Sequence, residues 1–313
     1  MLADLVREGP QARVQDQLKE AVAAFASPPM SLEHLYPYAG HHAIQSAIAV
    51  VEWADGAGGG VLPPENLAAL VAVAGIRLKE LGFPDQEPVQ VMQMAIGQGI
   101  PAGGGQTITL GGLHASKKGN APGTQARSVT LTRENLLVQI NDYTRWSKVR
   151  PDIEQCLQQL LPLVGEHRAV RRINLQFNDV FRWRANPADL HMGEVFRKVS
   201  PWLPAHVFEV PSFWHSHHGY LAERTAPITC QQLNNINVSY GQQDGEPTVQ
   251  AVLAHQGAMP VAAPLWVKTA EDVRPVMELL DAFHADNSSI LADIFSDEVL
   301  QRIKLKVPRA QGV

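Results

Sequence analysis

Cysteine, long apolar runs and clustered positive charge are all scarce in this chain of 313 residues. Its two cysteines, Cys156 and Cys230, lie far apart and outside any C-x-x-C arrangement. This spacing argues against a disulfide scaffold and a cysteine-based zinc site, and it favours a reducing compartment. No segment approaches the roughly 20 apolar residues of a membrane span, and the N-terminus lacks a basic region followed by an apolar core. We therefore expect a cytoplasmic protein without membrane insertion or secretion.

Basic residues are outnumbered, since 26 Lys and Arg stand against 31 Asp and Glu, for a formal net charge of -5. Without a basic run, nonspecific binding to nucleic acid is not expected. The sequence also contains no G-x-S-x-G, G-x-x-x-x-G-K-[ST] or H-E-x-x-H motif. The glycine-rich segment 97–105 imitates a dinucleotide fingerprint, but a proline and a predicted strand follow where a helix is required. The known catalytic motifs therefore assign no enzymatic activity to this chain.

Hydrophobic periodicity predicts alternating strands and helices in the first half of the chain. Residues 1–40 form an N-terminal appendage with a short amphipathic helix at 11–26. The apolar run from Ala43 to Trp53 predicts a strand, and Pro63 begins a helix that ends at Gly82. Strands are then predicted at 89–96, 107–114, 128–132 and 135–140, followed by a helix that has Ser147 as its N-cap and that ends near residue 164.

The second half opens with the clearest strand, at 172–183, in which apolar and polar residues alternate. A short helix at 190–199, strands at 207–222, 228–240 and 248–255, and a final helix from Thr269 with Asp272 at capping-box spacing complete the prediction. Both halves thus follow an order of strand, helix, several strands and helix. We expect an α+β fold of two pseudo-repeated βαβββα-like halves, 41–165 and 166–313, with long antiparallel strands and helices packed on the sheets.

Several short motifs together span roughly residues 40 to 303. They are an apolar strand from Ile44 to Val51, Tyr143-x-x-Trp146, Arg172-Ile173-x-Leu175, Leu280-Asp281-x-x-His284 and Phe295-Ser296-Asp297-Glu298. In this combination the chain resembles a sporadically distributed prokaryotic family of unknown function. The patchy distribution of such families suggests a role in bacterial antiviral defence or toxin immunity, beside a partner protein encoded nearby. The chain departs from the family pattern at Gln176, Phe177 and Asp179, where the resemblance implies arginine, tyrosine and asparagine, and near 253–255, where it implies an aspartate.

A cluster of histidines offers a candidate metal site. On a strand, His215, His217 and Glu223 have the same parity and point to one side, as ligands of Fe, Mn or Zn would. His255 or His114 is a possible further ligand from a neighbouring strand. The alternative is that these histidines simply lie exposed on a hairpin, with no cofactor. The adjacent pair His41 and His42 is a weaker candidate, because neighbouring residues on a strand face opposite ways.

Polar residues also mark a candidate binding surface. The run from Cys230 to Tyr240 is rich in amides, and burying an amide without a partner costs roughly 1–3 kcal/mol. These side chains should therefore face water, a cleft or another protein. We predict a hydrogen-bonding sheet face that binds a partner or ligand; its candidate residues are Arg172, Asn174, Gln176, Asn178, Gln232 and Asn234. A plain solvated sheet is the alternative.

Other polar residues have structural explanations. Asp281 and His284 are spaced to form a hydrogen-bonded pair on one helical face, and Asp297 and Glu298 complement a helix N-terminus after Ser296. The helical spacing around Cys156 predicts a packed side chain.

Three functions remain open from the sequence. The leading hypothesis is a non-enzymatic recognition or accessory protein, as the sensor or partner subunit of a defence or toxin-immunity system. The alternatives are a metal-dependent enzyme that uses His215, His217 and Glu223, and a structural subunit that assembles as a homo-oligomer.

Overall fold

The computed structural model describes residues 32–53, 61–94, 106–119, 124–210 and 212–305. The predicted helix at 11–26 and the glycine-rich segment 97–105 lie outside these ranges. The strands are β1 (Leu35–Pro37), β2 (Ile44–Glu52), β3 (Asp85–Met94), β4 (Gln106–Lys118), β5 (Gln125–Thr132), β6 (Asn135–Ile140), β7 (Arg172–Trp183), β8 (Trp214–Arg224), β9 (Cys230–Gln243) and β10 (Glu246–Ala258). The α-helices are α2 (Pro64–Glu80), α3 (Trp146–Gly165), α4 (Met192–Val195), α5 (Arg274–Ile294) and α6 (Asp297–Arg302).

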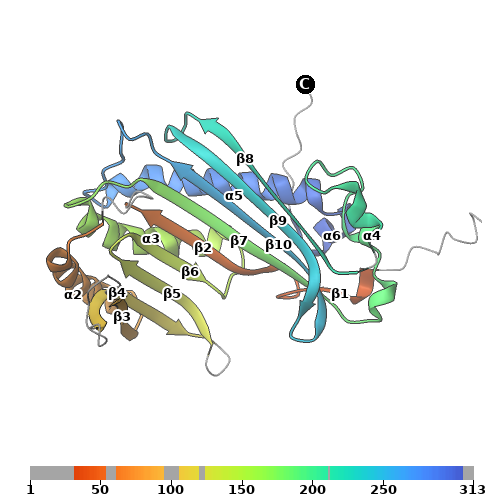
Figure 1. Cartoon of the computed structure of the whole chain (residues 1–313), viewed down its shortest axis with the longest axis horizontal. Helices are drawn as coiled ribbons and strands as arrows, with labels where there is room; N and C mark the ends of the chain where they lie inside the picture. The colour runs from red at the N-terminus through yellow and green to blue at the C-terminus, as the bar shows by residue number, and fades with distance from the viewer. Residues whose placement is uncertain (1–31, 54–60, 95–105, 120–123, 211, 306–313) are drawn as a thin grey trace, which may run out of the picture.

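All the strands belong to one antiparallel sheet, which confirms the α+β fold class (Figure 1). Its order is β3-β4-β5-β6-β2-β7-β10-β9-β8, and the short β1 pairs with β7 outside this path. Long antiparallel strands are therefore present as predicted. Residues 32–37 are part of the folded domain and not of an appendage, because Leu32 and Leu35 are buried and β1 extends the sheet.

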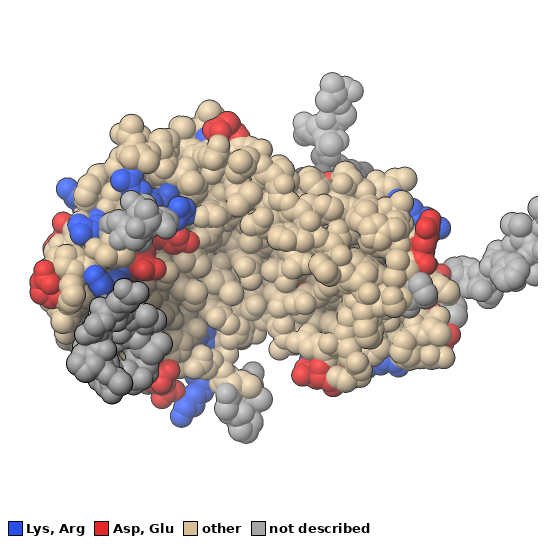
Figure 2. Space-filling view, viewed as in Figure 1, with Lys and Arg blue, Asp and Glu red and all other residues tan. Residues whose placement is uncertain are grey.

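The main helices lie on one face of the sheet: α2 contacts β4, α3 contacts β6, and α5 contacts β7 and β10. Figure 1 shows α3 and α5 behind the strands, so that the uncovered sheet face points to the viewer. On this face, Lys, Arg, Asp and Glu gather at the margins and leave the middle almost free of charge (Figure 2). None of the helices that the structure describes combines the length and the apolar character needed to cross a membrane.

Alternation along β7 explains how the sheet separates its two faces. Ile173, Leu175 and Phe177 are fully buried towards the helices, whereas the polar residues between them are half-buried on the uncovered face. Two groups of buried side chains form the core, one around α2 and α3 and one around α4 and α6. Helix α5 contributes Phe283 to the first group and Ile290 to the second. The hydrophobic core therefore does not divide at residue 165.

Local signals predicted several elements well. The strand at 43–53 and the helix from Pro63 are confirmed as β2 and α2. The side chain of Asp272 accepts hydrogen bonds from the backbone amides of Lys268 and Thr269, and the Thr269 hydroxyl accepts from the Asp272 amide. Asp272 itself lies in a 3₁₀ turn, Glu271–Val273, that leads into α5. Ser296 caps α6 by accepting from the amide of Val299, as expected.

Three predicted boundaries are wrong. Helix α3 begins at Trp146 with Arg145 at the N-cap position, so Ser147 is inside the helix and does not cap it. Val207 lies in a 3₁₀ turn, Ala205–Phe208, and the strand that was expected from 207 begins at Trp214. The helix expected at 190–199 is only the single turn α4. In this region tertiary packing of Val195, Phe196 and Val207, all fully buried, overrides the weak local periodicity.

Candidate functional site

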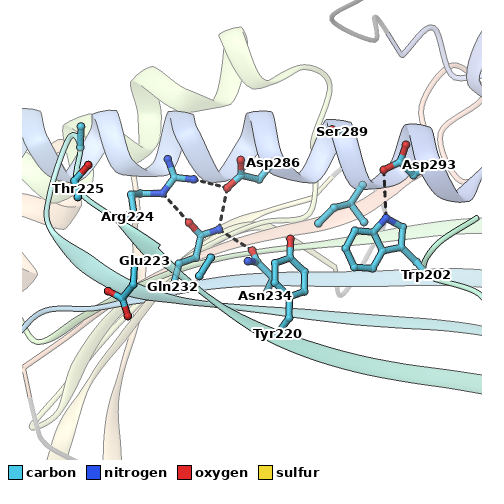
Figure 3. A pocket seen from close by; sticks show the side chains of 13 residues that line it. Trp202, Tyr220, Glu223, Arg224, Thr225, Gln232, Asn234, Asp286, Ser289 and Asp293 are labelled. Carbon is cyan, nitrogen blue, oxygen red and sulfur yellow. Dashed lines mark hydrogen bonds and ion pairs between the residues drawn. The ribbon is translucent and has the colours of Figure 1, made fainter. Parts of the chain in front are cut away.

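A cleft of about 530 Å³ opens between α5, the edge strand β8 and its neighbour β9 (Figure 3). Strand β9 contributes two of the predicted binding residues, Gln232 and Asn234. The other polar and aromatic residues of the cleft come from β8, from α5 and from the segment before β8; they include Tyr220, Glu223, Arg224, Asp286, Asp293 and Trp202. The cleft thus joins positions that lie up to 91 residues apart in the chain.

A continuous hydrogen-bond network forms the inner wall of the cleft. Arg224 donates to Gln232 Oε1 at 2.7 Å and to Asp286 Oδ2 at 2.6 Å. The Gln232 amide donates to the same Asp286 oxygen at 2.8 Å and to Asn234 Oδ1 at 2.7 Å. Gln232 and Asn234 are almost completely buried, so each amide needs such partners. The network therefore fixes the positions of the guanidinium and carboxylate at the back of the cleft (Figure 3).

His255 continues this network beneath α5. It pairs with Asn234 across the β9–β10 ladder, and its Nδ1 lies 2.6 Å from Asn234 Oδ1. Because an amide oxygen can only accept, His255 Nδ1 carries the proton. The ring is fully buried and stacks on Phe283 with centroids 5.9 Å apart. Burial lowers the pKa of His255 to about 4, although Asp286 and Asn287 nearby act in the opposite direction. The imidazole is therefore neutral at pH 7.

Two stacked aromatic rings form the outer wall of the cleft. Trp202 and Tyr220 have ring centroids 5.3 Å apart and planes within 16° of parallel. The indole Nε1 of Trp202 donates to Asp293 Oδ2 at 3.4 Å. In Figure 3 the carboxylate of Glu223 points away from the network, whereas Asp286 and Asp293 face the cleft from α5. An aromatic surface beside two carboxylates and one guanidinium gives the cleft a net negative character.

The predicted metal ligands do not converge. His215, His217 and Glu223 do share one face of β8, the face opposite the cleft network. Glu223 lies six residues beyond His217 on a continuous strand, about 20 Å away at the rise of an extended chain. One metal ion therefore cannot contact both His217 and Glu223. No group of three or more His, Cys, Asp or Glu side chains within the described ranges is placed to hold a metal ion.

The predicted additional ligands are also separate from that cluster. His255 lies on the helix-covered side of the sheet, whereas His215 and His217 are exposed on the other side. His114 belongs to β4, several strands away, where its Nδ1 lies 2.9 Å from the hydroxyl of Thr130. The metal prediction was based on the alternation of side chains along a single β-strand. His255 and His114 belong to other strands, so their imidazoles lie on a different face or in a different part of the sheet from His215 and His217.

The six predicted binding residues fall on two faces of the sheet. Arg172, Asn174, Gln176 and Asn178 are half-buried on the uncovered face, and Gln232 and Asn234 are buried on the helix face. The prediction that all six residues share a single binding face is therefore wrong. On the uncovered face, Glu52 accepts from Asn174 at 2.7 Å and from Arg172 at 3.4 Å. Asn178 donates to Gln45 at 2.9 Å and accepts from Gln250 at 2.7 Å, so these polar groups form cross-strand bonds.

Residues of two separate sequence motifs meet between α3 and α5. The indole Nε1 of Trp146 donates to Asp281 Oδ1 at 2.7 Å, and Arg150 Nε donates to the same carboxylate at 2.9 Å. The Trp146 and His284 rings stack with centroids 5.0 Å apart and an 8° interplanar angle. The carboxylate of Asp281 therefore binds α3 in place of the expected hydrogen bond to His284. Cys156, as predicted, is a packed side chain, and burial raises its pKa to about 12.

Sequence reasoning missed Trp202, Tyr220, Arg224 and Asp286 as site residues. Trp202 and Asp286 lie in a loop and on a helix with no local motif, and only the packing of α5 across the sheet brings them to β8. The sequence signal that did lead to the cleft was the amide-rich run in β9.

No profile of a known protein family matches this chain, and no curated protein sequence gives a significant match.

Proposed function

We propose that this chain is a cytoplasmic, non-enzymatic recognition protein that binds an extended segment of a partner protein along strand β8. The partner segment places a basic side chain in the cleft beside α5. The observation that carries this proposal is the position of the cleft, which adjoins a long strand at the end of the sheet. The two features together provide both backbone and side-chain recognition.

Strand β8 has the properties of a pairing edge. Among the described strands it has one neighbour, β9, so the backbone groups on its other side lack a sheet partner. From Trp214 to Ala222 it contains no residue that is permanently charged and no proline. Natural edge strands that avoid pairing are shortened, charged or interrupted by proline, and the segment Trp214–Ala222 of this 11-residue strand is none of these. Addition of a strand from another protein would satisfy its free donors and acceptors.

The cleft supplies the specificity. A strand added to β8 directs alternate side chains towards α5, in line with Tyr220 and Arg224. There a Lys or Arg side chain of the partner meets the face of the Trp202–Tyr220 pair and the carboxylate of Asp293. Stacking of a cation on an aromatic ring contributes about 0.5–2 kcal/mol, depending on its desolvation. Asp286 is already bound to Arg224 and holds the back wall in place.

The same proposal includes an internal duplication. Strands β2 and β7 are antiparallel neighbours at the centre of the sheet. From β2 the sheet continues outward through β6, β5, β4 and β3, and from β7 it continues outward through β10, β9 and β8. This topology supports two pseudo-repeated halves. With the family resemblance, it supports a sensor or partner subunit of a bacterial antiviral defence or toxin-immunity system, whose partner is encoded nearby.

Replacing Tyr220 by Ala is expected to abolish capture of the partner. Tyr220 is 37% exposed, and its loss removes half of the aromatic wall without opening the core. Truncation of a central aromatic anchor costs about 2 kcal/mol or more, which is a roughly 30-fold loss of affinity. The measurement is affinity purification of the tagged protein from its native host, with mass spectrometry of the bound proteins, followed by titration of the isolated partner. Tyr36→Ala on β1, where Tyr36 is 43% exposed, is the matched control. Equal retention of the partner by both variants would contradict the proposal.

Replacing Asp293 by Asn is expected to weaken binding of the isolated partner about 3- to 10-fold and to reduce its dependence on salt, because one rim charge is lost. Glu80→Gln, which neutralises an exposed carboxylate at the end of α2, should have no effect. Titrations at low and high salt distinguish the two variants. A partner that binds Asp293→Asn more tightly would show that the cleft receives an acidic or neutral group.

The unpaired edge of β8 also suits pairing with a second copy of this chain, which would make the protein a structural assembly subunit. Light scattering over a range of concentrations tests this alternative. A stable dimer that Tyr220→Ala dissociates would assign β8 to self-association.

A further inference from the structure

A second cavity, of about 390 Å³, lies on the other side of α5 from the cleft. It is enclosed by the residues before and at the start of β2, the N-terminus of α3, the middle of α5 and the residues that follow α6. Helix α5 separates the two spaces, since Asn287 and Ser288 line this cavity, whereas Asp286 and Ser289 line the cleft. Its volume is within the range of sites for small metabolites.

The inner end of this cavity gathers polar atoms that have no partner. Asp179 is 2% exposed, it is the carboxylate that lines the cavity, and its Oδ2 accepts no hydrogen bond. Buried Nδ1 of His42 lines the same cavity and also lacks a hydrogen-bond partner. Buried polar groups in folded proteins are nearly always paired, so two orphaned atoms at one cavity point to a ligand that pairs them. The carboxylate oxygen is an acceptor, and it requires an N–H or O–H donor.

Aromatic rings connect these atoms. Tyr143 stands edge-on to His42, with ring centroids 5.7 Å apart, and its pKa is raised, chiefly by burial and further by Asp179. Trp146 and His284 form the stacked pair described above and also line the cavity. These rings line the cavity together with the acceptors, and an apolar environment strengthens a hydrogen bond made to them.

The mouth of the cavity has the opposite character. Arg145 and Lys304 line it, and both side chains are exposed. Helix α3 begins here with no side-chain cap and no acidic residue in its first turn. The positive end of the helix dipole at this terminus therefore favours an anion.

We infer that this cavity binds a small polar metabolite that carries N–H donors at one end and a carboxylate or phosphate at the other. The donors pair with Asp179 and its neighbours, and the anionic end lies between Arg145, Lys304 and the N-terminus of α3. Free α-amino acids and nucleotides both have this bipolar chemistry. The inference does not depend on partner binding at β8, because none of its residues lies on that strand or in that cleft.

The test is ligand binding to the purified full chain, measured as a shift in melting temperature and then by calorimetric titration. One panel contains the proteinogenic α-amino acids, and the other contains nucleoside mono-, di- and triphosphates. We expect a compound from one panel to bind the wild type and to lose about 10- to 100-fold in affinity with Asp179→Asn, because that variant removes a charged acceptor. The double variant Arg145→Gln and Lys304→Gln should weaken the same compound about 10-fold, whereas a derivative without the anionic group should be unaffected by it.

Asp179→Asn preserves the shape of the side chain, so a loss of binding is not a loss of folding; circular dichroism of the variant confirms this. Asp85→Asn, on the exposed start of β3, is the matched control and should bind like the wild type. Two results would overturn the inference. Either no compound in the two panels binds the wild type, or the compound that binds does so equally well in Asp179→Asn.

Discussion

Replacing Asp179 by Asn is expected to raise the free energy of unfolding by up to about 4 kcal/mol at pH 8 and to change it little at pH 4. Burial raises the pKa of Asp179 from 3.8 in the unfolded chain to about 7 in the folded protein. This difference is about three pKa units, and each unit corresponds to about 1.36 kcal/mol. An ionised carboxylate without a partner therefore destabilises the fold, and a neutral amide of the same shape does not.

The direction in which stability changes with pH follows from proton binding to Asp179. Between pH 3.8 and about 7 the folded state holds the Asp179 proton and the unfolded state does not, so wild-type stability falls as the pH rises through this window. Below it both states are protonated, and the penalty disappears. The other titratable groups that line the cavity, or stand at its mouth, are common to both proteins; they are His41, His42, Tyr143, Arg145, His284 and Lys304. The pKa values of His42 and His284 are lowered, mainly by burial, so their contribution to stability falls as the pH decreases.

Denaturant unfolding of the wild type and the variant from pH 4 to pH 8 measures this effect, and the difference between the two curves isolates Asp179. Asp85→Asn should show no comparable pH-dependent gain, because Asp85 is exposed. A destabilised Asp179→Asn at pH 8 would mean that the carboxylate has a cationic partner in solution. If Asp179→Asn gained stability and also lost ligand binding, Asp179 would serve binding at a cost in stability, as residues of binding sites commonly do.

Replacing Phe177 by Ala is expected to lower the free energy of unfolding by about 3–5 kcal/mol, through lost burial and the cavity that remains. Phe177 is fully buried in β7 beneath α5. Its ring lies 6.0 Å from Tyr143, 6.1 Å from Trp146 and 5.8 Å from His284, measured between centroids. This side chain therefore supports the aromatic cluster between α3 and α5, whose members Tyr143, Trp146 and His284 line the second cavity.

Urea denaturation monitored by circular dichroism and tryptophan fluorescence provides the measurement. Ile76→Ala on α2 is the matched control, because Ile76 is 63% exposed and its truncation should change stability by less than about 0.5 kcal/mol. Phe177→Leu should fall between the two, since it retains most of the buried apolar area. If Phe177→Ala and Ile76→Ala had equal effects, the packing between β7 and α5 would be looser than this structure shows.

Elements with strong local signals were predictable from the sequence. The apolar run of β2, the proline that begins α2 and the alternation in β7 each depend on neighbouring residues in the chain, and all three are confirmed. The cap formed by Thr269 and Asp272 is also local, because its partners are three residues apart. Such signals determined the α+β class and most of the strands. They did not determine the start of β8, where buried contacts outweigh a weak pattern.

The functional surfaces depended on tertiary structure. The alternation of side chains along a strand correctly predicted that His215, His217 and Glu223 share one face. It gives no information about distance along the strand, and Glu223 is too far from the histidines to share an ion with them. The amides of β9 were recognisable as unusual, yet only the register with β8 and the position of α5 brought Gln232 to Arg224 and Asp286. Likewise, Asp179 and His42 are 137 positions apart and carry no shared motif. The sequence by itself determined which residues are apolar, capped or extended, because these properties arise from near neighbours. The packing of α5 across one sheet face decided which polar groups meet, because those contacts join segments that the chain holds far apart.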